Sequence, residues 1–329
     1  MDRRLVLAPL ISLGVLSLVP LLLGFNNYYL LLASLILLYT TMVSAWNIIG
    51  GFAGQVDLAA GAYHGIGIFV TGLLFIFYRV TPLVGIFLGG GVAALLALAI
   101  GYPTFRFGLR EVWYALSSLA LVVILYKLFL IWENVGGTIE RYLPKVGFSW
   151  FYLTFPGNYL YYYFMSALLL VATIAINIRV RYSKLGYYLL AIRENEEAAE
   201  MLGIDVRRYK LYALMIYSFI VGLTGGIFVL MLGYVHPVLF DSWISIQTAI
   251  LGIVGGLGSI AGGPIIAVVL LAVAEYLRVK FGGYIPGLHQ ILFAIILMVI
   301  VLFKPGGIGE WLDTLWRRLT VGRRVEEVA

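Results

Sequence analysis

The chain has 329 residues, of which 62% are hydrophobic and only 12% are charged, and its mean hydropathy is +1.01. Soluble domains are about half apolar and about a quarter charged, so this composition excludes a soluble protein and indicates an integral membrane protein. We attribute the net charge of +6 to basic cytoplasmic loops and not to nucleic-acid binding. Cysteine is absent, which excludes disulfides, thiolate metal sites and cysteine nucleophiles.

The apolar runs last about 20 residues, the length that crosses a bilayer as a helix, whereas barrel strands are about half as long. We therefore expect an all-α membrane bundle with spans at roughly 5–25, 28–49, 58–78, 81–102, 112–132, 159–178, 210–233, 244–259, 262–281 and 285–303. The first run lacks a small-residue cleavage site and is expected to be a retained helix. The eighth run is short and glycine-rich and could be re-entrant, but parity favours a crossing.

Most of the 22 basic residues fall in loops on the same side as the N-terminus, including 179–209 and the tail 304–329. The positive-inside rule then places both termini in the cytoplasm of a multi-pass protein of the plasma or inner membrane. The longest external loop is 133–158. The stretches "GGFAGQ" at 50–55 and "GGLGSI" at 255–260 both lie at inner helix ends, five spans apart, so two five-helix repeats are possible.

The stretch "AIRENEEAAEMLGI" at 191–204 is a charged segment in an otherwise apolar chain. At helical spacing Ile192, Ala199 and Leu202 share one side, and Gly203 is a suitable helix stop. This pattern predicts a short amphipathic helix over 191–203. It is either a solvated connector between spans or an element that docks into a partner protein, since small alanines allow another surface to approach closely.

Several motifs resemble those of a known transporter family. Glu197-Ala198-Ala199 followed by Gly203 resembles the "EAA…G" loop of ABC importer permeases. Stretches resembling branched-chain amino acid permeases of the LivM type occur in family order, over roughly residues 40–310, at 50–69, 112–121, 183–214, 255–264 and 302–308. The sequence departs from the family pattern at Asp57, where a serine is usual, at Ala59-Ala60, where Gly-His is usual, and at Val135, where a threonine is usual.

The resemblance implies that residues 1–329 form a single transmembrane permease domain, with 179–209 as a cytoplasmic coupling loop. Such a permease subunit would move branched-chain or related amino acids inward. It would act with a homologous second permease, two cytoplasmic ABC ATPases and an external substrate-binding protein. No G-x-x-x-x-G-K-[ST] run occurs, so ATP hydrolysis is expected in a partner chain, and no cofactor is expected. ATPase coupling is then expected to involve Arg193, Glu194, Glu197, Ala198, Ala199 and Gly203.

Candidate residues of the translocation pathway are Gln55, Asp57, Gly255, Gly256 and Gly258. Asp57 either caps a helix N-terminus or lines the route, because a carboxylate in an apolar span is costly unless it meets water or a partner. The glycines form either a tight turn or broken-helix backbone beside the route.

Other polar residues receive structural interpretations. We expect His64 and His289 to be packing residues, His236-Pro237 to mark a turn, and Glu275 to pair with Arg278.

Three alternative functions remain open from the residues. A permease for urea, short amides or another small polar solute would need a similar route. An ion-coupled secondary transporter usually buries charges at mid-membrane, and these are scarce here. An intramembrane enzyme could use Ser259 and His289, but no G-x-S-x-G or H-E-x-x-H motif is present. We therefore expect a transporter subunit and not an enzyme.

Overall fold

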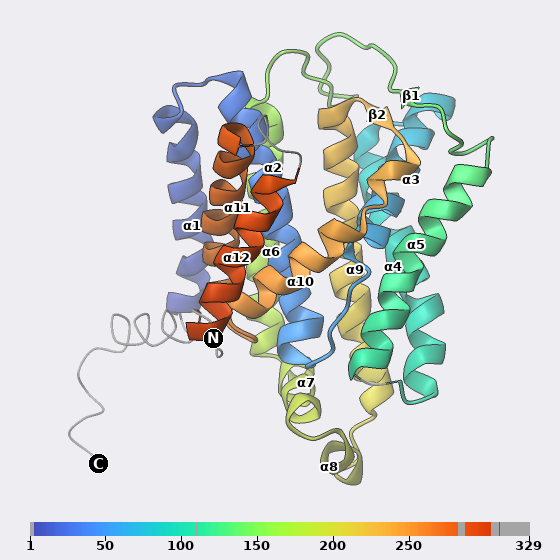
Figure 1. The fold of residues 1–329 in the computed structure, drawn as a ribbon, viewed down its shortest axis with the longest axis vertical. Coiled ribbons are helices and arrows are strands. Elements are labelled where there is room, and N and C mark those ends of the chain that lie inside the picture. Colours follow the sequence, from blue (N-terminus) through green and yellow to red (C-terminus); the bar gives the residue numbers. More distant parts are fainter. Residues whose placement is uncertain (1–2, 110, 282–286, 304–308, 310–329) are drawn as a thin grey trace.

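The computed structural model describes residues 3–109, 111–281, 287–303 and 309, and it is an almost entirely helical bundle (Figure 1). Within these described residues, eight helical segments are long and apolar enough to cross a membrane, which confirms the all-α membrane fold. The number of crossings and the internal repeat stay predictions. The apolar helices are α1 (Arg3–Leu22), α2 (Asn27–Trp46), α3 (Ala60–Tyr78), α4 (Pro82–Arg106), α5 (Glu111–Ile131), α6 (Leu160–Arg181), α9 (Val206–Leu232), α10 (Ser242–Val254), α11 (Gly262–Phe281) and α12 (Leu288–Phe303).

Short elements lie at the two ends of the bundle. At one end, α7 (Lys184–Glu194) and α8 (Glu196–Met201) project beyond the long helices, and at the other β1 (Arg141–Tyr142) pairs antiparallel with β2 (Tyr234–Val235) (Figure 1). Two further elements extend or precede long helices, namely the π-helix η1 (Asn47–Phe52) after α2 and the 3₁₀ turn η2 (Pro237–Leu239) before α10. The predicted coupling loop and the predicted external loop therefore occupy opposite ends.

The eighth predicted span differs from a simple helix over 244–259. Helix α10 alone has 13 residues, about 20 Å at 1.5 Å per residue, which is shorter than the roughly 30 Å hydrocarbon core. It reaches the length of a candidate span only together with η2, as the 18-residue segment Pro237–Val254. It crosses the middle of the bundle at an incline (Figure 1). Residues 255–259 form a turn and not helix, because Gly256 and Gly258 take φ values of 96° and 82° that end the helical path.

The centre of the bundle is built from α3, α4 and α9, which approach one another through glycines. A Cβ atom added at Gly222 of α9 would lie 2.7 Å from the Cα of Gly90 on α4. One added at Gly67 of α3 would lie 2.0 Å from the Gly222 carbonyl oxygen. Small residues at such crossings allow the close backbone packing that holds helices together in lipid.

Candidate functional site

The predicted coupling loop, residues 179–209, contains two helices and not the single helix predicted over 191–203. Asn195 between them is extended, with φ −161° and ψ 111°, and its side chain accepts a 3.0 Å hydrogen bond from the Ala198 backbone N–H. This cap starts α8, and the acidic residues of its first turn favour that helix end. The predicted stop is confirmed, since α8 ends at Met201 and Gly203 takes a φ of 82°.

The two alanines of the coupling loop lie on different surfaces. Ala199 is buried against Ile192 and Val206 within its own chain, whereas Ala198 is exposed, as are Glu194, Glu197 and Gly203. Of the two alanines that were expected to allow a close approach, only Ala198 is therefore accessible to a partner. The exposed tip is instead formed by Met201 and Leu202, which are 91% and 81% exposed.

Arg193 reaches from α7 into the bundle. Its Nη1 donates to the backbone oxygen of Gly51 in η1 at 2.7 Å, and to that of Leu257 in the glycine-rich turn at 3.4 Å. A Cβ at Gly54 would lie 2.9 Å from the Arg193 Cγ. Arg193 therefore connects the coupling loop to two backbone segments that lie far apart in the sequence.

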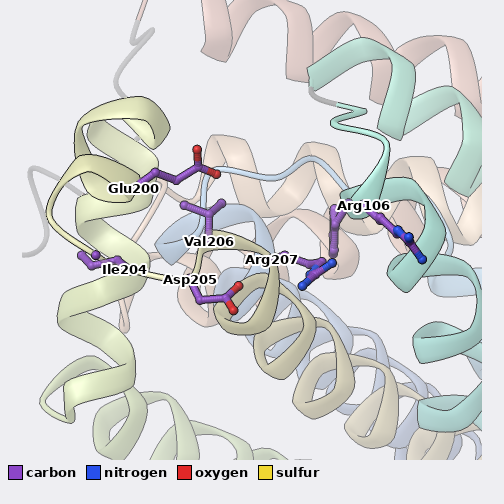
Figure 2. Close-up of a pocket in the computed structure, with 8 residues that line it drawn as sticks. Arg106, Glu200, Ile204, Asp205, Val206 and Arg207 are labelled. Atoms are coloured by element: carbon purple, nitrogen blue, oxygen red, sulfur yellow. The ribbon is translucent and has the colours of Figure 1, made fainter.

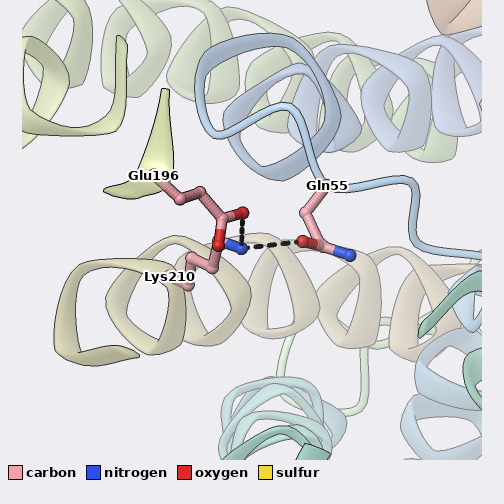
Figure 3. A network of polar contacts seen from close by, with 3 residues as sticks. All are labelled: Gln55, Glu196 and Lys210. Atoms are coloured by element: carbon pink, nitrogen blue, oxygen red, sulfur yellow. Dashed lines mark hydrogen bonds and ion pairs between the residues drawn. The ribbon is translucent and has the colours of Figure 1, made fainter. Parts of the chain in front are cut away.

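Lys210, in α9, makes a second connection of this kind (Figure 3). Lys210 is 2% exposed, and its ammonium group donates to the Gln55 Oε1 atom at 3.0 Å and forms an ion pair with Glu196 of α8. Sequence reasoning counted this lysine only as a cytoplasmic charge. The sequence did contain a signal for its burial. Lys210 stands at the start of a span, and residues 211–232 after it carry no charge.

Asp57 is completely buried in the segment between η1 and α3. The Tyr114 hydroxyl donates to its Oδ2 atom at 2.8 Å, and the Ala59 backbone N–H donates to its Oδ1 atom at 2.8 Å. Its backbone oxygen accepts from the Trp46 indole at 2.8 Å. These three bonds hold Asp57 and its segment in place, and the carboxylate is not exposed to solvent. The geometry favours an anchoring role.

The glycine-rich stretch forms the turn between α10 and α11. Asn47 holds this turn, because its Oδ1 atom accepts from the Gly258 N–H at 2.9 Å and its amide donates to the Ser259 carbonyl at 3.2 Å. Gly255 packs so closely that an added Cβ would lie 2.5 Å from the Gly263 Cα. Gly255 and Gly256 are buried. This geometry favours the interpretation as a tight turn.

Three polar residues have the structural partners expected from the sequence. The His64 Nδ1 atom lies 3.0 Å from the Thr224 Oγ1 atom, which confirms a packed, hydrogen-bonded histidine. His236 accepts from the Val238 N–H at the start of η2, and Arg278 pairs with Glu275 at 2.7 Å. The side chain of His289 lies outside the described residues.

A cavity of about 440 Å³ lies beside the junction of α8 and α9, and it reaches the end of α4 (Figure 2). Glu200 and Asp205 provide negative charge at this cavity, and Arg106 and Arg207 provide positive charge. The coupling loop therefore presents a hollowed surface of mixed charge next to its apolar tip.

Comparison with known proteins identifies related chains. Residues 28–302 match the family described as "Branched-chain amino acid transport system / permease component". The Escherichia coli permease protein LivM is 25% identical over 299 residues, which cover 84% of this chain and 69% of the relative. A probable LivH permease of Methanocaldococcus jannaschii is 26% identical, over 77% of this chain and 82% of the relative. Escherichia coli LivH is 24% identical, over 83% of this chain and 91% of the relative. No solved structure matches the chain.

Proposed function

The chain belongs to the family of branched-chain amino acid transport permease components, and from this premise we propose that it is the permease subunit of an ATP-binding-cassette importer. It moves branched-chain or related amino acids inward. Its partners are a homologous second permease, two cytoplasmic ATPases and an external substrate-binding protein. The observation that carries the proposal is the projecting pair α7–α8, which is bonded to the interior of the bundle through Arg193 and Lys210.

The tip of the coupling loop has the chemistry of a docking element. Met201 and Leu202 are almost fully exposed at the projecting end of the molecule. Large apolar side chains in contact with water are favourable binding points when they lie together, and a short helix seated in a groove is a recurrent recognition mode. Glu194, Glu197 and Glu200 of the same two helices are exposed and add negative charge, which suits a groove that carries basic residues.

The contacts behind the tip provide a route for motion. A displacement of α7 pulls on the Gly51 and Leu257 carbonyls through Arg193. A displacement of α8 acts on Gln55 through Glu196 and Lys210. The contacts of Arg193 end on η1 and on the turn 255–261, and the contact of Lys210 ends on the segment 53–59. Rigid packed elements of this kind transmit movement between distant sites when they have two arrangements.

Copurification tests the docking proposal. A tagged permease is isolated from its native membrane, and the associated chains are identified. We expect an ATPase to copurify with the unmodified chain and with Met201→Leu, which keeps an apolar tip. Met201→Asp removes that apolar contact and is expected to lose the ATPase while the permease stays folded. Equal recovery of the ATPase with both variants would contradict docking at this tip.

Uptake by the isolated complex tests the substrate and the energy source. The complex is reconstituted in vesicles with its binding protein, and uptake of leucine, urea and acetamide is measured with and without ATP. We expect ATP-dependent leucine uptake. Uptake of urea or acetamide in place of leucine would favour a permease for small amides, and uptake driven by an ion gradient without nucleotide would indicate a secondary transporter.

A further inference from the structure

A second cavity lies between α2, α9, α10, α11 and α12. No residue of the coupling loop lines it. Its volume is about 340 Å³, near the lower end of the roughly 300–1,000 Å³ range of ligand sites. Its polar lining comes from five segments of the chain and consists of Tyr39, Asp241, Gln247, Glu275, Arg278 and Gln290. So many polar groups around one cavity are unusual in apolar helices, since each is costly to place in a membrane without a partner.

Charges of both signs meet at this cavity. Arg278 donates to the Glu275 Oε2 atom through Nη2 at 2.7 Å and Nε at 2.9 Å. Asp241 uses its Oδ1 atom to accept from the Trp243 N–H at 2.8 Å. Tyr39, Asp241, Glu275 and Arg278 all line this one cavity, so groups of both charges face the same space. A ligand carboxylate can pair with the guanidinium there, and a ligand ammonium can pair with the carboxylates.

Two amide side chains increase the polar capacity of the cavity. The side-chain amides of Gln247 on α10 and Gln290 on α12 form no hydrogen bond with a described residue, and neither side chain is buried. An amide offers both donors and an acceptor. These two amides beside charged groups therefore favour a polar occupant over a lipid tail.

The rest of the cavity lining is apolar. It includes Phe228, Trp243, Ile244 and Phe293. Phe228 is held from behind by an edge-on contact with the buried His64 ring, at 4.9 Å between centroids. Aromatic and aliphatic walls with few polar groups are typical of sites that hold a small apolar side chain.

We propose that this cavity is a transit site for a zwitterionic amino acid with an aliphatic side chain. Arg278 binds the carboxylate, Asp241 and Glu275 bind the ammonium, and Phe228, Trp243, Ile244 and Phe293 enclose the side chain. The inference rests on the proposed import of amino acids, and it adds where the substrate is held within this subunit.

Thiol labelling tests occupancy directly, because the native chain has no cysteine. In the complete complex, Gln247→Cys places a single thiol of this chain in the cavity. Ala274→Cys, in a separate variant, places one at a second position of the same cavity. Millimolar L-leucine is expected to slow modification by a small polar reagent. 3-Methylbutylamine, which lacks the carboxylate, and 4-methylpentanoate, which lacks the ammonium, are expected to protect poorly.

Lys280→Cys, which lies on α11 outside the cavity, is expected to label equally with and without leucine. Absence of leucine protection at both cavity thiols would overturn the proposal, as would equal protection by the three compounds.

Transport kinetics provide the second test, with a matched pair of charge removals on one helix. Arg278→Gln is expected to raise the half-saturating leucine concentration about ten-fold, the equivalent of one lost contact of roughly 1.4 kcal/mol. Lys280→Gln also removes one positive charge, two residues further along α11, and is expected to leave that concentration unchanged. Equal effects of the two variants would refute the site. ATPase copurification is measured in both, so loss of assembly would be recognised as a failure of the importer proposal and not of this site.

Discussion

Lys210 shows how one side chain can join the coupling loop to the bundle interior. A charged lysine that is 2% exposed is costly to bury, and here Glu196 supplies the opposite charge while Gln55 supplies a neutral acceptor. Glu196 belongs to α8 and Gln55 to the segment before α3. Lys210 therefore fixes the distance between the projecting tip and the bundle interior.

We predict that Lys210→Met separates ATPase binding from transport. Methionine has a similar length but no charge, so it leaves the buried Gln55 oxygen without its donor, at a cost of about 1–3 kcal/mol. We expect the variant to unfold at a lower temperature and to copurify with the ATPase as the unmodified chain does. We also expect much less leucine uptake per ATP hydrolysed. The control is Lys184→Met, an exposed lysine at the start of α7. Uptake that is equal in the two variants would contradict the proposed role of Lys210.

Asp57 gives a second prediction at the scale of a residue. Asn retains an acceptor for the Ala59 N–H, and the Tyr114 hydroxyl can accept from its amide, so Asp57→Asn should stay near normal stability and transport. Asp57→Ala leaves both donors buried without a partner, which should cost about 2–4 kcal/mol. Thermal unfolding in detergent and leucine uptake distinguish the two variants. If Asp57→Asn unfolds normally but does not transport, the residue acts in the pathway and not as an anchor.

At the scale of helices, the close approach of α3, α4 and α9 makes particular glycines irreplaceable. A Cβ at Gly222 meets backbone, 2.7 Å from the Gly90 Cα, and α4 cannot yield there without moving away from α9. We predict that Gly222→Ala destabilises the protein by about 1–3 kcal/mol, as overpacking commonly does. Larger side chains at this position should prevent folding.

Gly91 provides the matched control for this prediction. It is the next residue after Gly90 on α4, and an added Cβ there has no atom within 4 Å. Gly91→Ala is therefore expected to be neutral, or to stabilise by up to about 1 kcal/mol through helix propensity. Unfolding temperatures of the two variants test the pair, and a similar loss in both would show that space between helices is not the cause.

Across the whole molecule, what could be predicted followed from local patterns. Apolar run length located the spans, and charge spacing identified the coupling loop and the Glu275–Arg278 pair. The break at Asn195 was missed because the alanine and leucine spacing on either side continued a single helical pattern. The burial of Ala199 and the contact between Lys210 and Gln55 depend on segments that only tertiary packing brings together. For the same reason, the cavity between α2 and α12 had no local signal.

The last prediction concerns which end of the molecule faces the cytoplasm. The loop 133–158 and the α8 tip lie at opposite ends (Figure 1), and the positive-inside rule predicts that α8 lies inside. In intact cells, an impermeant maleimide should modify Thr138→Cys, an exposed position of that loop. It should reach Met201→Cys only after permeabilisation or in inverted vesicles, and bound ATPase should then protect Met201→Cys but not Thr138→Cys. Modification of Met201→Cys in intact cells would put the tip outside. A cytoplasmic ATPase could not reach it there, so docking at α8 would be ruled out whatever the substrate.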